Sequence, residues 1–297
     1  MKKFLFFLLP GLIFAAIYFG RIFYKQYQED REHQEWLANA EDTASENVTV
    51  LKDSILIDYQ NEKRTVHLYL PPGYFEDSIT YPVIYMLDGD GSFSDLVSQA
   101  PEWQVDEVID STVAAGGPAA IVIGIPSAED RDAEYTPWVN DDNPDAHGEA
   151  FIDWLVNDFK PWVDTNFRTQ PARAATGVGG ISRSGMMAYY TMMSHPETFG
   201  IGLIQSPSMW VDEERLLAMD DPANGWGEDT RVFVSVGELE APMVPQAQGV
   251  YDKFAAAGLR KDDQLRMHVF EGLGHWHLTW RKSFRMAYPW IVEEAND

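Results

Sequence analysis

The chain has 297 residues, no cysteine and a formal net charge of −25 at pH 7, from 22 basic and 47 acidic side chains. The absence of cysteine excludes a disulfide, a cysteine nucleophile and a thiolate metal site. A surface this acidic repels phosphate backbones, so no binding to nucleic acid is expected, whereas a hydrophobic content of 45% suffices for a large core.

An apolar run stands near the start of the chain. Residues 4–20 carry no charge and follow two lysines. This run is longer than the apolar region of a cleavable signal, about 7–15 residues, and the small-x-small triplet at 38–40 lies too far downstream. Residues 1–25 are therefore predicted to form an N-terminal transmembrane anchor, with a cleaved signal segment as the alternative. The domain is then expected outside the cytoplasm, in the periplasm, touching the inner membrane only through this helix.

Residues 26–47 are polar and acid-rich and are predicted to be a linker, followed by a domain at 48–297. Apolar or alternating runs predict strands at 54–59, 65–70, 82–87, 119–124, 174–178, 200–205, 232–236 and 265–270. Helical patterns fill 104–115, 149–166, 185–194, 245–257 and 283–294. This alternation predicts an α/β fold with a mainly parallel sheet, helices on both faces, and an antiparallel hairpin of the first two strands at one edge.

The segment 177–210 predicts a short strand, a sharp turn that carries a serine, and a helix. Its residues 180–184, Gly-Ile-Ser-Arg-Ser, are close to the G-x-S-x-G pattern of a nucleophile elbow, with Ser184 in the last glycine position. Such a turn exposes the serine hydroxyl and leaves the next backbone N–H free to stabilise an oxyanion. Ser182 is therefore the predicted nucleophile; the alternative is that it only caps the following helix.

A serine nucleophile needs a base and an acid. The loop after the last predicted strand reads Gly-Leu-Gly-His at 272–275, and the glycines allow the close approach of a base, so His275 is favoured over His277. A metal-binding His-x-His pair lacks a supporting carboxylate or cysteine pattern. Glu240, chosen over Glu238, follows the strand at 232–236 and completes the chain order Ser…Asp/Glu…His.

A Gly-rich turn at residues 88–91, Asp-Gly-Asp-Gly, follows the strand at 82–87. An oxyanion hole needs backbone donors at such a place, and the N–H groups of Asp90 and Arg183 are the predicted donors. The turn also resembles the start of a calcium-binding EF-hand loop. That interpretation fails because Phe93 and Gln99 stand where glycine and glutamate are required.

These motifs, in this order, resemble the family named "Putative esterase", which groups siderophore esterases, feruloyl esterases, S-formylglutathione hydrolases and mycolyltransferases. The matching segments are RTVHLYLPPGY at 64–74, YPVIYMLDGDG at 81–91, 120–138, 151–169, SPSMW at 206–210, VGELE at 236–240 and GHWHLTW at 274–280. The resemblance implies an α/β-hydrolase fold with Ser182 as nucleophile, Glu240 as acid and His275 as base. It departs from the family pattern at Ser184, a usual glycine, and at Glu134, where aspartate is common.

The expected activity is hydrolysis of a small-molecule carboxylic ester, siderophore-like or aryl, through an acyl-enzyme and without a metal or organic cofactor. Five tryptophans in loops or at helix starts are expected to surround the substrate: Trp103, Trp138, Trp210, Trp276 and Trp280. Ordinary packing is the alternative role for each of them. Two other functions stay open, an acyltransferase that uses the same triad and a non-catalytic ligand-binding module.

Overall fold

The computed structural model describes residue 31 and residues 33–98, 100–223 and 225–293. The chain divides into one unit that ends at Asp42 and a second that begins at Thr43, inside the predicted linker. The run at 4–20, predicted to span a membrane, lies outside the described residues. Within the part that is described, no helix combines the length and apolarity needed to cross a bilayer.

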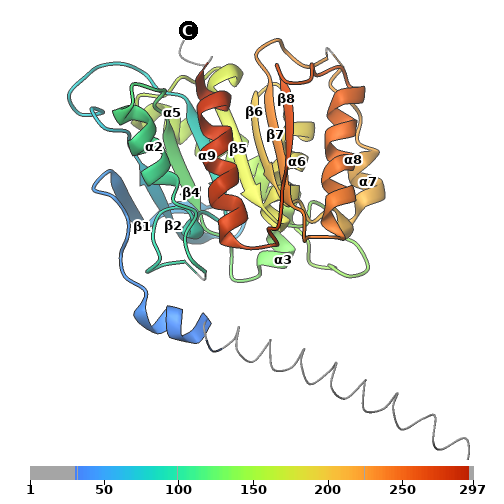
Figure 1. The fold of residues 1–297 in the computed structure, drawn as a ribbon, viewed down its shortest axis with the longest axis horizontal. Helices are drawn as coiled ribbons and strands as arrows, with labels where there is room; N and C mark the ends of the chain where they lie inside the picture. Colours follow the sequence, from blue (N-terminus) through green and yellow to red (C-terminus); the bar gives the residue numbers. More distant parts are fainter. Residues whose placement is uncertain (1–30, 32, 99, 224, 294–297) are drawn as a thin grey trace, which may run out of the picture. The chain divides into compact units, whose positions relative to one another are not determined.

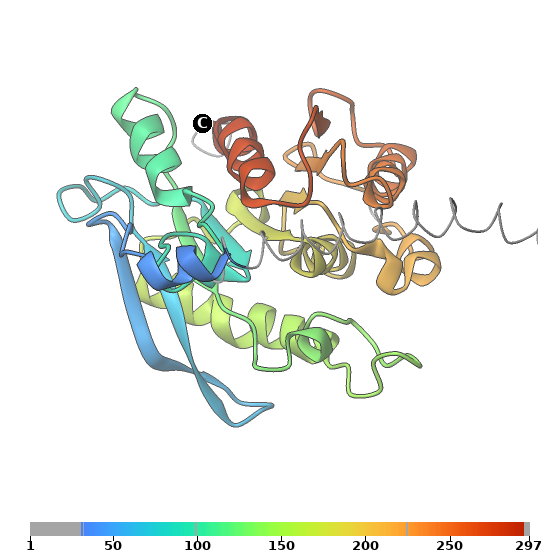
Figure 2. The same cartoon turned by 60° about the horizontal axis from the view of Figure 1, so that its bottom comes forward.

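An eight-stranded sheet forms the centre of the second unit (Figures 1 and 2). Its strands, in spatial order, are β1 (Val48–Ile57), β2 (Glu62–Tyr69), β4 (Ile121–Ile125), β3 (Val83–Leu87), β5 (Thr176–Ile181), β6 (Ile201–Gln205), β7 (Arg231–Gly237) and β8 (Leu265–Phe270). The pairs β1–β2 and β2–β4 are antiparallel and the other pairs are parallel. The predicted mainly parallel sheet with an antiparallel edge hairpin is confirmed.

The longer helices also lie where the sequence predicts them. They are α2 (Val105–Ala114), α4 (Gly148–Trp154), α5 (Lys160–Asn166), α6 (Arg183–Ser194), α8 (Met243–Ala256) and α9 (His277–Glu293). A single helix was expected over 149–166, and α4 and α5 are instead joined by a π-helical turn, Leu155–Phe159. The short α3 (Arg131–Glu134) and α7 (Glu213–Leu217) were not predicted, because four or five residues are too few to show a helical period.

Alternate side chains of the central parallel strands enter two separate cores. In β3, Val83, Tyr85 and Leu87 face the core that includes α4, α6 and α8. Ile84 and Met86 face the opposite core, built with α2 and α9, and α9 crosses in front of the sheet in Figure 1. Helices therefore cover both faces, as expected for strands that are apolar on both sides.

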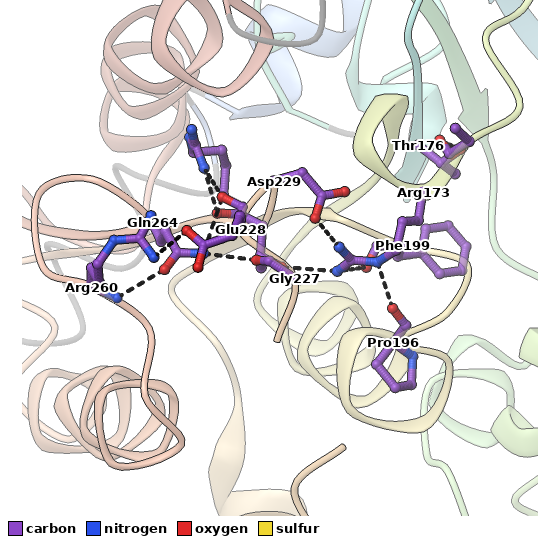
Figure 3. A network of polar contacts seen from close by, with 12 residues as sticks. Arg173, Thr176, Pro196, Phe199, Gly227, Glu228, Asp229, Arg260 and Gln264 are labelled. Carbon is purple, nitrogen blue, oxygen red and sulfur yellow. Dashed lines mark hydrogen bonds and ion pairs between the residues drawn. The ribbon is translucent and has the colours of Figure 1, made fainter. Parts of the chain in front are cut away.

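A polar network ties together the amino ends of neighbouring strands, and Figure 3 shows it from close by. Arg173, just before β5, forms an ion pair with Asp229 and donates hydrogen bonds to Pro196 O at 2.9 Å and Thr230 Oγ1 at 2.9 Å. Gln264, just before β8, donates to Gly227 O at 2.8 Å. These contacts fix the sheet at the end where the strands begin and leave the carboxyl ends free for other side chains.

Candidate active site

Polar side chains gather where the parallel strands end. Asp88 follows β3, Ser182 follows β5, Ser206 follows β6, Glu240 comes three residues after β7, and His275 comes five residues after β8. Parallel strands place their carboxyl ends on one edge of the sheet, which is where α/β folds bind ligands. A pocket of about 240 Å³ lies there, lined by Asp88, Asp90, Gly91, Ser98, Ala100, Trp103, Arg131, Ile181, Ser182, His275 and Trp280.

Ser182 occupies the sharp turn between β5 and α6. Its φ of 61° and ψ of −120° lie in a region that residues with a side chain rarely adopt, at a cost of about 1–3 kcal/mol. The hydroxyl does not cap α6 but lies 3.1 Å from Ser208 Oγ. The turn is so tight that a Cβ on Gly180 would lie 2.3 Å from Ser184 O, so glycine is needed at this position. The backbone thus holds the Ser182 hydroxyl out at the pocket.

Ser184 connects this turn to the 88–91 turn. It is fully buried, and its Oγ lies 2.7 Å from Asp88 Oδ2, 2.8 Å from Ile181 O and 2.9 Å from Ile181 N. The Asp88 carboxylate also accepts two hydrogen bonds from Arg131, at 2.8 Å from Nε and 2.5 Å from the second guanidinium nitrogen. Serine therefore fits in the usual glycine position and adds a polar contact between the two turns.

His275 and Glu240 form a pair at the same pocket. His275 Nδ1 lies 2.6 Å from Glu240 Oε2, and the Glu240 side chain is fully buried. The other carboxylate oxygen accepts hydrogen bonds from Ser206 Oγ at 2.9 Å and from the Gly237 N–H at 2.6 Å. A carboxylate held in this way fixes the orientation of the imidazole and leaves its Nε2 available toward the pocket.

The two alternative residues lie in other surroundings. Burial lowers the pKa of His277 to about 4, and the positive charge of the nearby Arg281 contributes less to this shift. The His277 Nδ1 has no hydrogen-bond partner among the described residues. Glu238 is exposed and accepts a hydrogen bond from the Gly272 N–H at 2.8 Å. Of these candidates, the structure pairs His275 with Glu240.

The two predicted oxyanion donors flank Ser182 in different ways. Asp90 lies in the 3₁₀ turn η1 (Gly89–Gly91) and lines the pocket. Burial and then the Asp88 carboxylate raise the pKa of the Asp90 side chain to about 7. Arg183 is the first residue of α6, so its backbone N–H has no acceptor within the helix. Its guanidinium turns toward Thr136 Oγ1, at 3.0 Å.

Two of the five tryptophans form a wall of the pocket. Trp103 and Trp280 both line it and meet edge to face with their ring centroids 6.4 Å apart. Trp280 also meets the His275 ring edge to face, at 5.2 Å. This wall presents an apolar surface beside the base.

The other three tryptophans do not line this pocket. Trp138 donates to Asp212 Oδ2 at 2.8 Å and packs under Arg215, whose guanidinium carbon is 3.9 Å from the ring centroid. Trp210 and Trp276 are 57% and 48% exposed. Of the five predicted tryptophans, the structure thus places only Trp103 and Trp280 at this pocket.

Comparison with known proteins assigns the family. A family model described as "Putative esterase" matches residues 58–291. The chain belongs to this esterase family. It is 25% identical over 252 residues to "Uncharacterized protein YbbA" of Bacillus subtilis, covering 80% of the chain and 95% of that protein. It is also 28% identical over 151 residues to a siderophore triacetylfusarinine C esterase of Aspergillus fumigatus, covering 47% of the chain and 49% of that protein.

The fold of this esterase is shared with solved structures. The BES protein from Bacillus cereus aligns with a TM-score of 0.67 and 21% identity, covering 85% of the chain and 97% of that protein. The family assignment made from the sequence motifs is confirmed, together with an α/β esterase-like fold, and membership of this family supports an ester hydrolase activity.

Sequence reasoning did not single out two side chains that this esterase brings to the pocket. Arg131 lines it and binds Asp88, and Ser208 contacts the Ser182 hydroxyl. Both lie in segments that resemble the family, at 120–138 and 206–210. The motifs were therefore available as a signal, but only the folded chain shows what the two side chains contact.

Proposed function

We propose that Ser182, His275 and Glu240 form a catalytic triad that hydrolyses a small-molecule carboxylic ester through an acyl-enzyme. One observation carries the proposal most directly. His275, paired at 2.6 Å with the buried Glu240 carboxylate, and the strained Ser182 line the same pocket although the three residues come from three different loops. A hydrogen bond between nucleophile and base is often long in a free enzyme and tightens when the substrate binds.

In the proposed first step, Ser182 Oγ attacks the ester carbonyl while His275 Nε2 takes its proton. Glu240 stabilises the imidazolium, and the N–H groups of Asp90 and Arg183 stabilise the oxyanion. The intermediate collapses, the protonated His275 returns its proton to the leaving alcohol, and an acyl-Ser182 ester remains. A water molecule deprotonated by His275 then attacks this ester, and His275 returns the proton to Ser182 Oγ as the carboxylic acid is released.

The pocket and the relatives support a proposal for the substrate class. The Trp103–Trp280 wall suits an aromatic or otherwise apolar group beside the scissile bond. One relative is a siderophore esterase, which supports a siderophore-like ester as a candidate. We further propose that residues 1–25 attach the enzyme to the inner membrane with the domain in the periplasm, on the basis of the apolar run at 4–20.

The test is hydrolysis of p-nitrophenyl acetate and p-nitrophenyl butyrate by the full-length protein and by Ser182→Ala. We expect turnover by the parent and only the uncatalysed rate with the variant. Ser194→Ala is the matched control, because that hydroxyl donates to Tyr190 O one turn earlier on α6 and should not affect the rate. Equal turnover by the parent and Ser182→Ala would refute the assigned nucleophile.

The same assay separates the two competing functions. Added acceptor alcohol diverts the acyl group of an acyltransferase into a new ester, which the product analysis detects. A folded parent without turnover on any ester tested would favour a ligand-binding module.

A further inference from the structure

Three acidic side chains meet outside the pocket, around the start of α2. They are Glu102, Asp106 and Glu107, and one carboxylate oxygen of each lies within 4.8 Å of those of the other two. Glu102 is 2% exposed and Asp106 is fully buried. Three like charges at this distance and depth repel one another and have little access to water. The arrangement therefore needs a compensating charge or bound protons.

Only some of the carboxylate oxygens have partners within the protein. Glu102 Oε1 accepts a hydrogen bond from the Thr43 hydroxyl at 2.5 Å, and Asp106 Oδ2 accepts one from the Ser45 N–H at 2.7 Å. Glu102 Oε2, Asp106 Oδ1 and Glu107 Oε2 have no hydrogen-bond partner in the described part of the chain outside the cluster, within which the Asp106 and Glu107 carboxyls contact each other. Each residue of the cluster thus has an oxygen left over, and buried oxygens of this kind need a ligand.

The charged groups around the cluster do not neutralise it. Arg281 donates to Glu102 O at 2.6 Å and its charge favours the Glu102 carboxylate, but burial prevails and raises the pKa of Glu102 to about 7. Burial, with Asp106 and Glu102 beside it, raises the pKa of Glu107 to about 8. Asp95 adds a further negative charge near Glu102. Arg281 is thus bonded to the Glu102 backbone, and it is the three carboxylate oxygens left without a partner from the rest of the described chain that point to a ligand.

We propose that Glu102, Asp106 and Glu107 bind one divalent cation of the size of calcium. Calcium takes oxygen ligands at about 2.3–2.6 Å, so ligand oxygens up to about 5 Å apart can share one ion. The 4.8 Å limit on the three oxygens agrees with that span. Water molecules would complete the coordination on the partly exposed Glu107 side.

A cation at this position would stabilise one wall of the pocket. Thr43 and Ser45 attach the start of the second unit to the cluster, and Glu102 directly precedes Trp103. The ion would therefore hold the segment at 43–47 and the chain at 102–103 against α2. This binding is independent of the proposed ester hydrolysis, since none of the three ligands lines the pocket.

The test uses the full-length protein after treatment with EDTA and removal of the chelator. Calcium chloride is titrated in by isothermal calorimetry, and thermal unfolding is followed with and without it, against sodium chloride of equal ionic strength. We expect one calcium per chain and a Tm higher by at least about 5 °C at saturating calcium. Glu107→Gln should lose this rise, yet unfold no earlier than the parent without calcium, because it removes a repelling charge.

Two further variants test whether the response to calcium depends on this cluster. Glu76→Gln removes an exposed charge elsewhere and should keep the full calcium response. Glu102→Gln leaves Glu107 in place and should weaken calcium binding at least tenfold. No heat and no change in Tm in the parent would overturn the proposal. An equal rise in Tm in the parent and in Glu107→Gln would overturn the proposal as well, because calcium would then only screen the charges of an acidic surface.

Discussion

The Ser184 hydroxyl lies 2.7 Å from Asp88 Oδ2, and this contact joins two turns that are distant in the sequence. Ser184 belongs to the turn that carries the proposed nucleophile, whereas Asp88 starts the turn that carries the proposed oxyanion donor Asp90. Asp88 adopts a left-handed conformation, with φ of 57°, and Arg131 holds its carboxylate from the other side. The contact therefore sets the position of one turn relative to the other.

Ser184→Ala should lower kcat without much effect on KM. A hydrogen bond to a charged group contributes about 1.5–3 kcal/mol, so loss of half of this in the transition state gives a kcat lower by about four- to twelvefold. The measurement is steady-state hydrolysis of p-nitrophenyl butyrate, with Ser194→Ala as control on the same helix. An unchanged kcat, or a loss confined to KM, would show that the contact does not position the two turns.

Glu240→Gln should reduce kcat by about 10²–10⁴-fold, because an amide cannot stabilise the imidazolium as a carboxylate does. The variant keeps the shape of the side chain, so the thermal unfolding curve should show a folded protein. Glu238→Gln is the matched control, because Glu238 is two residues away, is exposed and accepts a hydrogen bond from the Gly272 N–H; this variant should retain full activity. If the two variants exchanged these results, the acid of the triad would be Glu238.

Asp90→Asn should change the pH dependence of the reaction. Burial and the Asp88 carboxylate raise the pKa of Asp90 to about 7, so its side chain is neutral below that pH and negative above it. A negative charge at this place opposes the developing oxyanion. The ratio of kcat/KM for Asp90→Asn to that of the parent should therefore rise severalfold between pH 6 and pH 8.5.

The control for this profile is Asp142→Asn, which removes an exposed carboxylate elsewhere and should give a constant ratio. A constant ratio for Asp90→Asn too would mean that the Asp90 side chain does not act on the reacting carbonyl.

The sequence predicts those parts of the fold and site that depend on neighbouring residues. Apolar runs and Gly-rich turns are local, so β5, α6 and the turn at Ser182 lie close to where their patterns place them. β1 begins at Val48 rather than at residue 54, because its first half is largely exposed and is held by pairing with β2 instead of by an apolar pattern. Such pairing is not visible in the strand's own residues.

Contacts between residues distant in the sequence could not be predicted for the same reason. Ser184 and Asp88 are 96 positions apart, and nothing near either residue indicates the other. The role of a tryptophan depends on which loops fold over it, so Trp103 could not be distinguished from Trp210 by residue type. In the folded chain the first is 7% exposed in the pocket wall and the second is 57% exposed.

Glu134, a departure from the family pattern, forms a buried ion pair with Arg64. Its Oε1 lies 2.8 Å from the Arg64 guanidinium, its Oε2 accepts the Ala128 N–H at 2.7 Å, and the side chain is fully buried. Glu134→Gln should therefore lower the free energy of unfolding by about 3–5 kcal/mol, because it leaves the Arg64 charge buried without a counter-charge.

Urea denaturation measures this loss. Glu134→Asp, which restores the usual family residue, should cost less, since a shorter carboxylate keeps the charge but cannot reach both Arg64 and the Ala128 N–H. Replacing both Arg64 and Glu134 by methionine should recover most of the lost free energy of unfolding, because a buried pair of apolar side chains needs neither a counter-charge nor a hydrogen bond. Arg260→Gln, from an exposed ion pair with Asp263, should change stability little. If Glu134→Gln changed the free energy of unfolding as little as Arg260→Gln does, the ion pair would not stabilise the core. Water would then have to reach the Arg64 guanidinium.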